Sequence, residues 1–107
     1  MFKSSISELM AESEKLRATL LFKLIRKRKW GESHIPLDKV KRLAPGHLRG
    51  EAGEIILKLK KENLILSKPT HYGEEISLNP KEAETIYQIV KRHFEIPKIF
   101  NTKTKEE

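Results

Sequence analysis

The sequence predicts a single domain of the α+β class that is mainly α-helical. Its 107 residues provide for one hydrophobic core, because domains typically contain about 100 to 150 residues. Apolar residues recur at helical spacing in most of the chain, and residues 64–78 change to short apolar runs separated by proline and glycine. We therefore expect one folded domain over residues 1–100, followed by a disordered polar tail over residues 101–107.

The first predicted helix is long. Ser5 and Glu8 have the spacing of a capping box, and apolar residues continue at helical spacing to Ile25, so the helix is expected to end near Lys29. The apolar stripe is unusually wide over residues 20–25. This helix is therefore either buried on two sides or in contact with another chain.

Two further helices are predicted in the middle of the chain. Pro36 favours an extended backbone at the residue before it. A short helix is expected to open at Asp38, with Val40, Leu43 and Ala44 facing inward, and to end at the Pro-Gly pair that follows. A second helix is expected over residues 47–62, with Asn63 in the left-handed conformation that often follows a helix. Its inward stripe consists of Leu48, Ala52, Ile55, Ile56 and Leu59.

A β-hairpin and a last helix complete the predicted fold. Residues 64–66 and 76–78 are expected to form two short strands, joined by a loop with its tip in residues 68–74. Asn79 followed by a proline is the clearest helix start in the sequence, because Asn is a favoured N-cap and Pro a favoured first helical residue. The apolar stripe of this helix continues to Phe94.

This order of elements resembles the winged helix-turn-helix, and in particular archaeal DNA-binding proteins of that type. The segment IILKLKKENLIL carries the resemblance most closely, because it looks like the family's junction between recognition helix and wing. The resemblance covers about residues 16–79. It implies a winged helix-turn-helix with a long N-terminal helix, a short β-hairpin wing and an additional C-terminal helix. It also implies that residues 47–62 form the recognition helix, whose N-terminal part enters the major groove of DNA, and that residues 68–74 form the wing.

Positive charge is concentrated in one part of the chain. Residues 23–49 contain nine lysines and arginines against two acidic residues, which accounts for the whole net charge of +7. The segments before and after are neutral in sum. The basic run over residues 26–29 could be a solvated helix end, where cations complement the helix dipole. The further uncompensated cations favour a polyanionic partner instead.

The candidate nucleic-acid-binding residues are the cations of this region together with the polar and aromatic residues of the expected wing. They are Arg26, Lys27, Arg28, Lys29, Lys39, Lys41, Arg42, His47, Arg49, Lys58, Lys68, Thr70, His71 and Tyr72. The wing residues suit phosphate contacts or stacking on a base or sugar. Tyr72 could instead fold back on the core, and Trp30 is interpreted as a core residue in preference to a nucleic-acid contact.

The expected recognition helix lacks the usual side chains for contact with bases. Its first turns read RGEAGE, with two glycines and two acids where Ser, Thr, Gln, Asn or Arg would be usual. Gly50 and Gly53 either permit close packing against the first helix or let a nucleic-acid backbone or partner protein approach. Binding to the nucleic-acid backbone is therefore better supported than recognition of a base sequence.

The sequence offers little that could support catalysis. There is no cysteine, the four histidines do not form an H-x-x-x-H pair, and no phosphate-binding glycine loop or nucleophile motif occurs. We predict neither an enzyme nor a metal or cofactor site. No apolar run is long enough to span a bilayer and the N-terminus does not resemble a signal peptide, so we expect a cytoplasmic protein. Few Asn and Gln and many Lys, Glu and Ile are typical of thermophiles.

Three functions remain open at this point. The first is a double-stranded DNA-binding transcription regulator or architectural protein. The second is an RNA- or ribosome-associated winged-helix protein, and the third is a protein-interaction module of an archaeal information-processing complex. A homodimer is expected, because the first and last helices offer more apolar surface than one small core needs.

Overall fold

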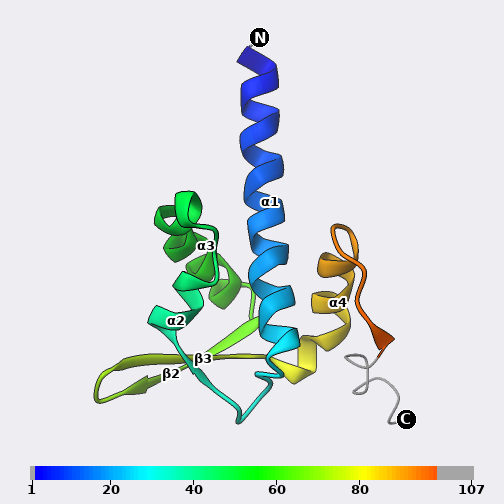
Figure 1. Cartoon of the computed structure of the whole chain (residues 1–107). Coiled ribbons are helices and arrows are strands. Elements are labelled where there is room, and N and C mark those ends of the chain that lie inside the picture. Colours follow the sequence, from blue (N-terminus) through cyan, green and yellow to red (C-terminus); the bar gives the residue numbers. More distant parts are fainter. Residues whose placement is uncertain (1, 99–107) are drawn as a thin grey trace.

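The computed structural model describes the backbone of residues 2–98 and the side chains of residues 11–98, so the expected polar tail over residues 101–107 lies outside the described residues. The chain forms an α+β structure that is mainly helical, as predicted (Figure 1). Its elements are α1 (Phe2–Arg26), β1 (Ile35–Pro36), α2 (Leu37–Arg42), the 3₁₀ turn η1 (Gly46–Leu48), α3 (Arg49–Lys61), β2 (Ile65–Thr70), β3 (Gly73–Leu78), the 3₁₀ turn η2 (Pro80–Glu82) and α4 (Ala83–Lys91).

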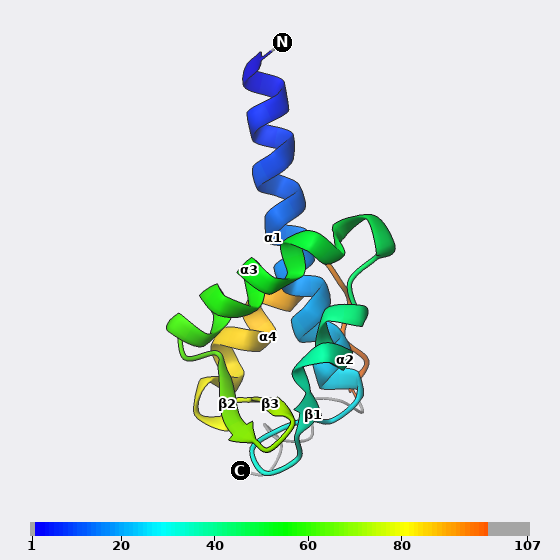
Figure 2. The same cartoon turned by 90° about the vertical axis from the view of Figure 1, so that its left-hand side faces the viewer.

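The three strands form one small antiparallel sheet in the order β1-β3-β2. Ile35 of β1 lies opposite Ile76, and β2 and β3 pair from Ile65 opposite Leu78 to the end of the hairpin. The β2–β3 hairpin extends well beyond the helices, and Figure 2 shows its tip turned toward the viewer below α2 and α3. The sheet therefore combines a core-facing base with a projecting arm.

Helix α1 runs through the centre of the fold and is buried on two sides. Leu20, Leu21, Leu24 and Ile25 are at most 1% exposed, and α1 contacts α3 on one side and α4 on the other. Two-sided burial thus explains the wide apolar stripe. The N-terminal half of α1 extends away from this body (Figures 1 and 2). Within the described residues, no helix has both the length and the apolar character that a membrane span requires.

The predicted bounds of α1 are wrong at both ends. The helix begins at Phe2, so the backbone at Ser5 lies inside it and not at the predicted start. It ends at Arg26, three residues early, because Arg28 adopts a left-handed conformation with φ of 56°. The Lys29 amide then donates to the Leu24 carbonyl at 3.1 Å, a bond that closes the helix end.

The two middle helices match the prediction in their inward faces. Val40 and Ala44 are buried at α2, and the stripe of α3 is buried from Ala52 onward. Residues 46–48 form a 3₁₀ turn, so α3 begins at Arg49, two residues later than expected. Asn63 follows α3 with φ of 63°, which confirms its predicted left-handed conformation.

The hairpin is longer than predicted and its turn is tighter. The strands cover Ile65–Thr70 and Gly73–Leu78, so the expected loop over residues 68–74 shrinks to His71 and Tyr72. Pro69 does not end the strand, because β2 is an edge strand, where a missing backbone N–H is tolerated.

The last helix begins where predicted and ends early. The Asn79 side chain accepts a hydrogen bond from the Lys81 amide at 3.1 Å, which confirms the N-cap. The first turn is 3₁₀, and α4 ends at Lys91. Phe94 lies beyond it and stacks on Phe22 with a centroid distance of 4.9 Å.

Candidate nucleic-acid interface

The exposed residues of α3 carry three cations and two carboxylates. They are Arg49, Gly50, Glu51, Glu54, Leu57, Lys58 and Lys61. Among them, Leu57 is 51% exposed. A Cβ atom added at Gly50 would meet nothing within 4 Å, and one at Gly53 would meet the Lys41 Cε atom at 3.8 Å, an ordinary contact. The interpretation that these glycines permit close packing against α1 is therefore wrong, since the chain itself leaves room for side chains at both positions.

The hairpin is tied to α3 by charge near its tip, where Glu74 lies opposite Pro69. Lys60 Nζ lies 2.6 Å from Glu74 Oε2, and the Ser67 hydroxyl donates to the same oxygen. The hydrogen bonds from Lys60 and Ser67 hold the pKa of Glu74 below its ordinary value. This contact holds the outer part of the hairpin against the last turn of α3.

The hairpin tip presents an aromatic pair to solvent. Tyr72 is 98% exposed, so the alternative that it folds back on the core is wrong. Its ring lies edge-on to His71 with a centroid distance of 6.4 Å, and its amide donates to the Thr70 hydroxyl at 3.2 Å, which stabilises the turn. Lys68 is exposed on β2. These wing candidates are close in space and open to a ligand.

The hollow between the hairpin and α2 is acidic. It has a volume of about 340 Å³, and its lining includes Asp38, Glu74 and Glu75 as well as Thr70 and Tyr72. Only Glu74 has a lysine partner within the ion pairs of the described residues, and Glu75 faces His34 at 3.8 Å. An anion is disfavoured inside this hollow, whatever contacts the hairpin tip makes.

The candidates on α2, η1 and the start of α3 lie around the loop that joins the two helices. Lys39, Arg42, His47 and Arg49 are exposed. Arg49 Nη2 donates to the Arg42 carbonyl at 3.3 Å. This bond links the last residue of α2 to the first residue of α3.

Lys41 lies between α2 and α3, and Lys58 lies on the side of α3 that faces α1. Lys41 is half-buried, with its Cε atom near the Cα of Gly53. Lys58 points to the other side of α3, where it shares a hollow with Glu12, Glu51 and Glu54. The structure therefore does not bring Lys58 into the cationic region.

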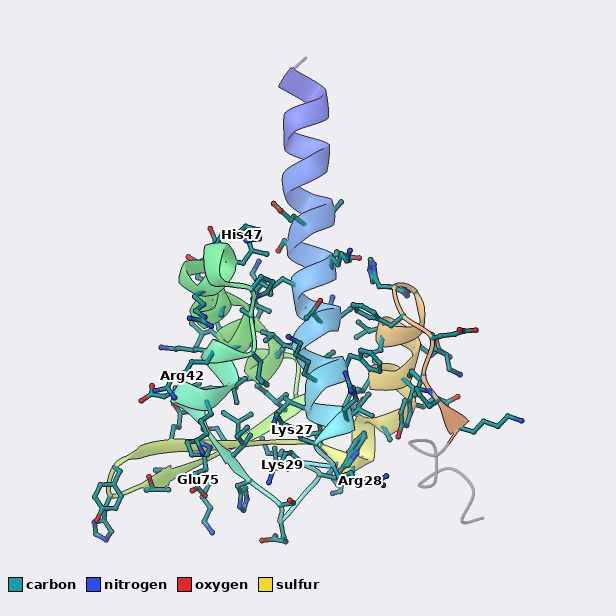
Figure 3. All side chains as sticks on the ribbon, in the orientation of Figure 1. Lys27, Arg28, Lys29, Arg42, His47 and Glu75 are labelled. Atoms are coloured by element: carbon teal, nitrogen blue, oxygen red, sulfur yellow. The ribbon has the colours of Figure 1, made fainter. Side chains whose placement is uncertain are left out.

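The basic run lies at the lower end of α1. Figure 3 shows Lys27, Lys29 and Arg28 there, whereas Arg42 and His47 lie on the side of α2 and α3. Lys27 and Arg28 are exposed, and Lys29 is half-buried. Of the three, Arg28 belongs to the left-handed helix end described above.

Arg26, the first residue of the run, and its neighbours Trp30 and Lys23 make defined contacts. Arg26 lies over the Phe22 ring, 5.9 Å from its centroid. Trp30 packs against the core and its ring lies 5.8 Å from that of Tyr87, as expected for a core residue. Lys23, which contributes to the excess charge but is not among the predicted contacts, donates from Nζ to the Leu43 carbonyl at 2.7 Å. Its signal in the sequence is its spacing, because Lys23, Arg26 and Lys27 occupy positions i, i+3 and i+4 of a helix.

Comparison with known proteins gives no match to this chain among protein-family models, curated proteins or solved structures. Within the residues that the structure describes, no group of three or more His, Asp or Glu side chains could hold a metal ion. The charge distribution and the shape of the surface are therefore the observations that bear on function.

Proposed function

We propose that this chain is a winged helix-turn-helix protein that binds duplex DNA through its phosphates. The observation that carries the proposal is the combination of topology and charge. Two short helices are followed by a projecting hairpin on a β1-β3-β2 sheet, and all the excess positive charge lies between Lys23 and Arg49. In proteins of this architecture the second helix and the hairpin approach the duplex.

The surface favours contact with the backbone over recognition of a base sequence. Gly50, Glu54 and Leu57 are exposed on α3, and their side chains donate no hydrogen bond to a base edge. The exposed donors of this helix are the cations Arg49, Lys58 and Lys61. Cations, by contrast, bind phosphates of any sequence and release counter-ions when they do. We therefore expect an architectural or weakly selective binder in preference to a regulator with a narrow operator.

A titration against labelled duplexes of unrelated sequence tests the proposal. Affinity should fall steeply between about 50 and 200 mM salt, with a logarithmic slope of about −0.9 for each phosphate contacted. Affinities for the different duplexes should agree closely. Absence of binding at low salt, or affinity that does not respond to salt, would contradict the proposal.

An RNA-associated role is the second candidate, and the hairpin tip favours it. Tyr72 is 98% exposed, and an exposed aromatic ring can stack on an unpaired base of any identity. A competition between duplex DNA and folded RNA of equal length separates the two roles. Tighter binding of the RNA, abolished in Tyr72→Ala, would favour the second.

We also propose that two copies associate through the projecting half of α1. The apolar residues of α4 pack against the rest of the chain, since Ile86, Tyr87, Ile89 and Val90 are all buried. The proposed dimer contact therefore lies on α1 and not on α4. The backbone of the N-terminal half of α1 extends away from the body (Figure 1), and Ile6, Leu9 and Met10 recur there at helical spacing in the sequence. Light scattering at high micromolar concentration should give twice the mass of the chain, and a monomer there would refute the association. Archaeal origin, a thermophilic source and a cytoplasmic location stay predictions.

A further inference from the structure

A cationic hollow lies at the lower end of α1, beside the end of α2. Lys23, Arg26 and Lys27 line it together with Leu43, and its volume is about 450 Å³. The three cations share one face of the helix end because of their i, i+3 and i+4 spacing. Figure 3 shows Lys27 at this end of α1. We call this site the α1–α2 hollow.

The charge of the α1–α2 hollow is not neutralised by any ion pair among the described residues. Its lining contains no carboxylate. The ion pairs of the described residues join Arg17 with Glu62, His34 with Glu75, and Lys60 with Glu74, so they leave out all three cations of the hollow. Three like charges around one concave surface produce a positive potential that attracts an anion.

Other hollows on the described surface have a different character. The hollow beside the hairpin contains Asp38 and Glu75. The hollow between α1 and α3 contains Glu14 and Glu62, and the smaller one above it contains three glutamates. A phosphate would meet carboxylates at each of those places and meets none in the α1–α2 hollow.

Two of the three cations are held in place before any ligand binds. Lys23 is half-buried and donates one of its three N–H groups to the Leu43 carbonyl at 2.7 Å, which leaves two for a ligand. Arg26 lies over Phe22, which is itself stacked on Phe94. Side chains that are already ordered lose less entropy when a ligand binds.

We propose that the α1–α2 hollow binds a phosphate group, and that it is a principal phosphate contact of the nucleic acid, in preference to the outward face of α3. The claim that this phosphate belongs to nucleic acid rests on the proposed function. The claim that the hollow binds a phosphate group does not rest on it, because a free phosphate ion presents the same charged oxygens as a nucleic-acid phosphate. Three of the nine cations of residues 23–49 line this hollow.

The test compares two double variants of the full chain that each remove two positive charges. Arg26→Gln with Lys27→Gln alters the hollow, and Lys58→Gln with Lys61→Gln is the matched control on α3. Duplex DNA affinity is measured over a range of salt concentrations. We expect the hollow variant to flatten the logarithmic salt slope by about 0.9 for each phosphate that it no longer neutralises, and the control to leave the slope nearly unchanged. Thermal unfolding followed by circular dichroism checks that both variants remain folded, and Lys27→Gln alone serves if the double variant does not.

A second measurement distinguishes the sources of phosphate. Inorganic phosphate is titrated into isotope-labelled chain, and amide NMR signals are followed. We expect the shifts to concentrate at residues 23–27 and at Leu43, and to disappear in the hollow variant. A polyglutamate peptide provides a carboxylate of comparable charge density.

The outcomes separate the two proposals. If the control weakens DNA binding and the hollow variant does not, the inference is overturned while the proposed function stands. If the chain binds inorganic phosphate at the hollow and no nucleic acid, the proposed function fails and the phosphate site stands. Shifts spread over the whole cationic surface, or equal shifts with polyglutamate, would overturn the phosphate site itself.

Discussion

Replacing Gly53 with alanine should stabilise the protein. Gly53 lies inside α3 and is absent from the residues with positive φ, so alanine can adopt its backbone conformation. Glycine in a helix interior costs about 1 kcal/mol relative to alanine. The added Cβ would lie 3.8 Å from the Lys41 Cε atom, which is an ordinary van der Waals contact at the flexible end of a side chain. Nothing therefore offsets the gain of about 1 kcal/mol.

Replacing Gly31 with alanine should destabilise the protein. Gly31 has φ of +57°, and a Cβ there would lie 3.4 Å from Pro80 Cγ. The left-handed conformation costs an alanine about 1 to 2 kcal/mol. The two variants carry an identical chemical change, so they differ only in backbone conformation and surroundings.

Thermal and urea unfolding followed by far-UV circular dichroism measure both effects. For a domain of this size, a change of about 1 kcal/mol shifts the unfolding temperature by about 4 to 8 °C, so Gly53→Ala should raise it and Gly31→Ala lower it. Unchanged or reduced stability in Gly53→Ala would refute the reasoning, because it would mean that α3 has a close neighbour at this point. If Gly53→Ala raises stability but lowers DNA affinity, a backbone approaches α3, contrary to a dominant role for the α1–α2 hollow.

Three further predictions concern a charge, a cap and a buried phenol. Because the pKa of Glu74 lies below its ordinary 4.5, its interaction with Lys60 stabilises the fold above that pH and disappears as pH falls through the lowered pKa. Glu74→Gln should lower the free energy of unfolding by at most about 1 kcal/mol at neutral pH, with a smaller effect near about pH 3, measured with urea; an effect that does not change with pH would contradict the ion pair. Asn79→Ala removes the hydrogen bond from the Lys81 amide and should cost about 1 kcal/mol; an unchanged unfolding midpoint would contradict the cap. Burial raises the pKa of Tyr87 above 10.0, so its neutral form stabilises the fold below that pH, and the stability falls as pH rises through the raised pKa. Tyr87→Phe should lessen the fall in unfolding temperature above about pH 10, and an identical fall would count against it.

The interior of the fold is predictable where local signals and packing agree. Asn63 is expected in a left-handed conformation after a helix and has φ of 63°. Asn79 is expected as an N-cap and accepts the predicted kind of hydrogen bond. In both cases the residue type has an intrinsic preference for the conformation that the fold needs.

Predictions fail where a residue adopts a conformation that its type disfavours. They also fail where the tertiary structure tolerates a residue that would normally end an element. Arg28 is left-handed, and arginine gives no local signal for that, so the predicted first helix is too long at this end. Pro69 normally interrupts a strand, yet on the edge strand β2 it leaves the pairing with β3 intact. Both facts depend on the tertiary structure.

The candidate site is predictable in its charge and not in its geometry. Counting residues locates the excess cations, but helix packing decides which of them share a surface. Lys58 is grouped with the other cations by its charge and lies among glutamates. Lys23 interrupts the apolar stripe of α1 in the sequence, and its hydrogen bond to the Leu43 carbonyl places it at the α1–α2 hollow.

The short segment from Leu78 to Asn79 joins four elements through its backbone and one side chain. The Leu78 amide donates to the Lys29 carbonyl at 2.7 Å, and its carbonyl accepts from the Gly31 amide at 3.0 Å. Asn79 donates from its amide and from Nδ2 to the carbonyls of Leu64 and Asn63. The ends of α1 and α3 are thereby tied to β3 and to the start of α4.

This junction determines how the molecule opens. Local fluctuation of any one of the four elements breaks hydrogen bonds that hold the others, so we expect the amides of Gly31, Leu78 and Asn79 to exchange with solvent hydrogen only when the whole domain unfolds. A fragment that stops at residue 78 would contain α1, α2, α3 and the hairpin, yet would leave the buried faces of α1 without α4. The smallest cooperative unit therefore includes the last helix, and α4 is part of the domain's folding core.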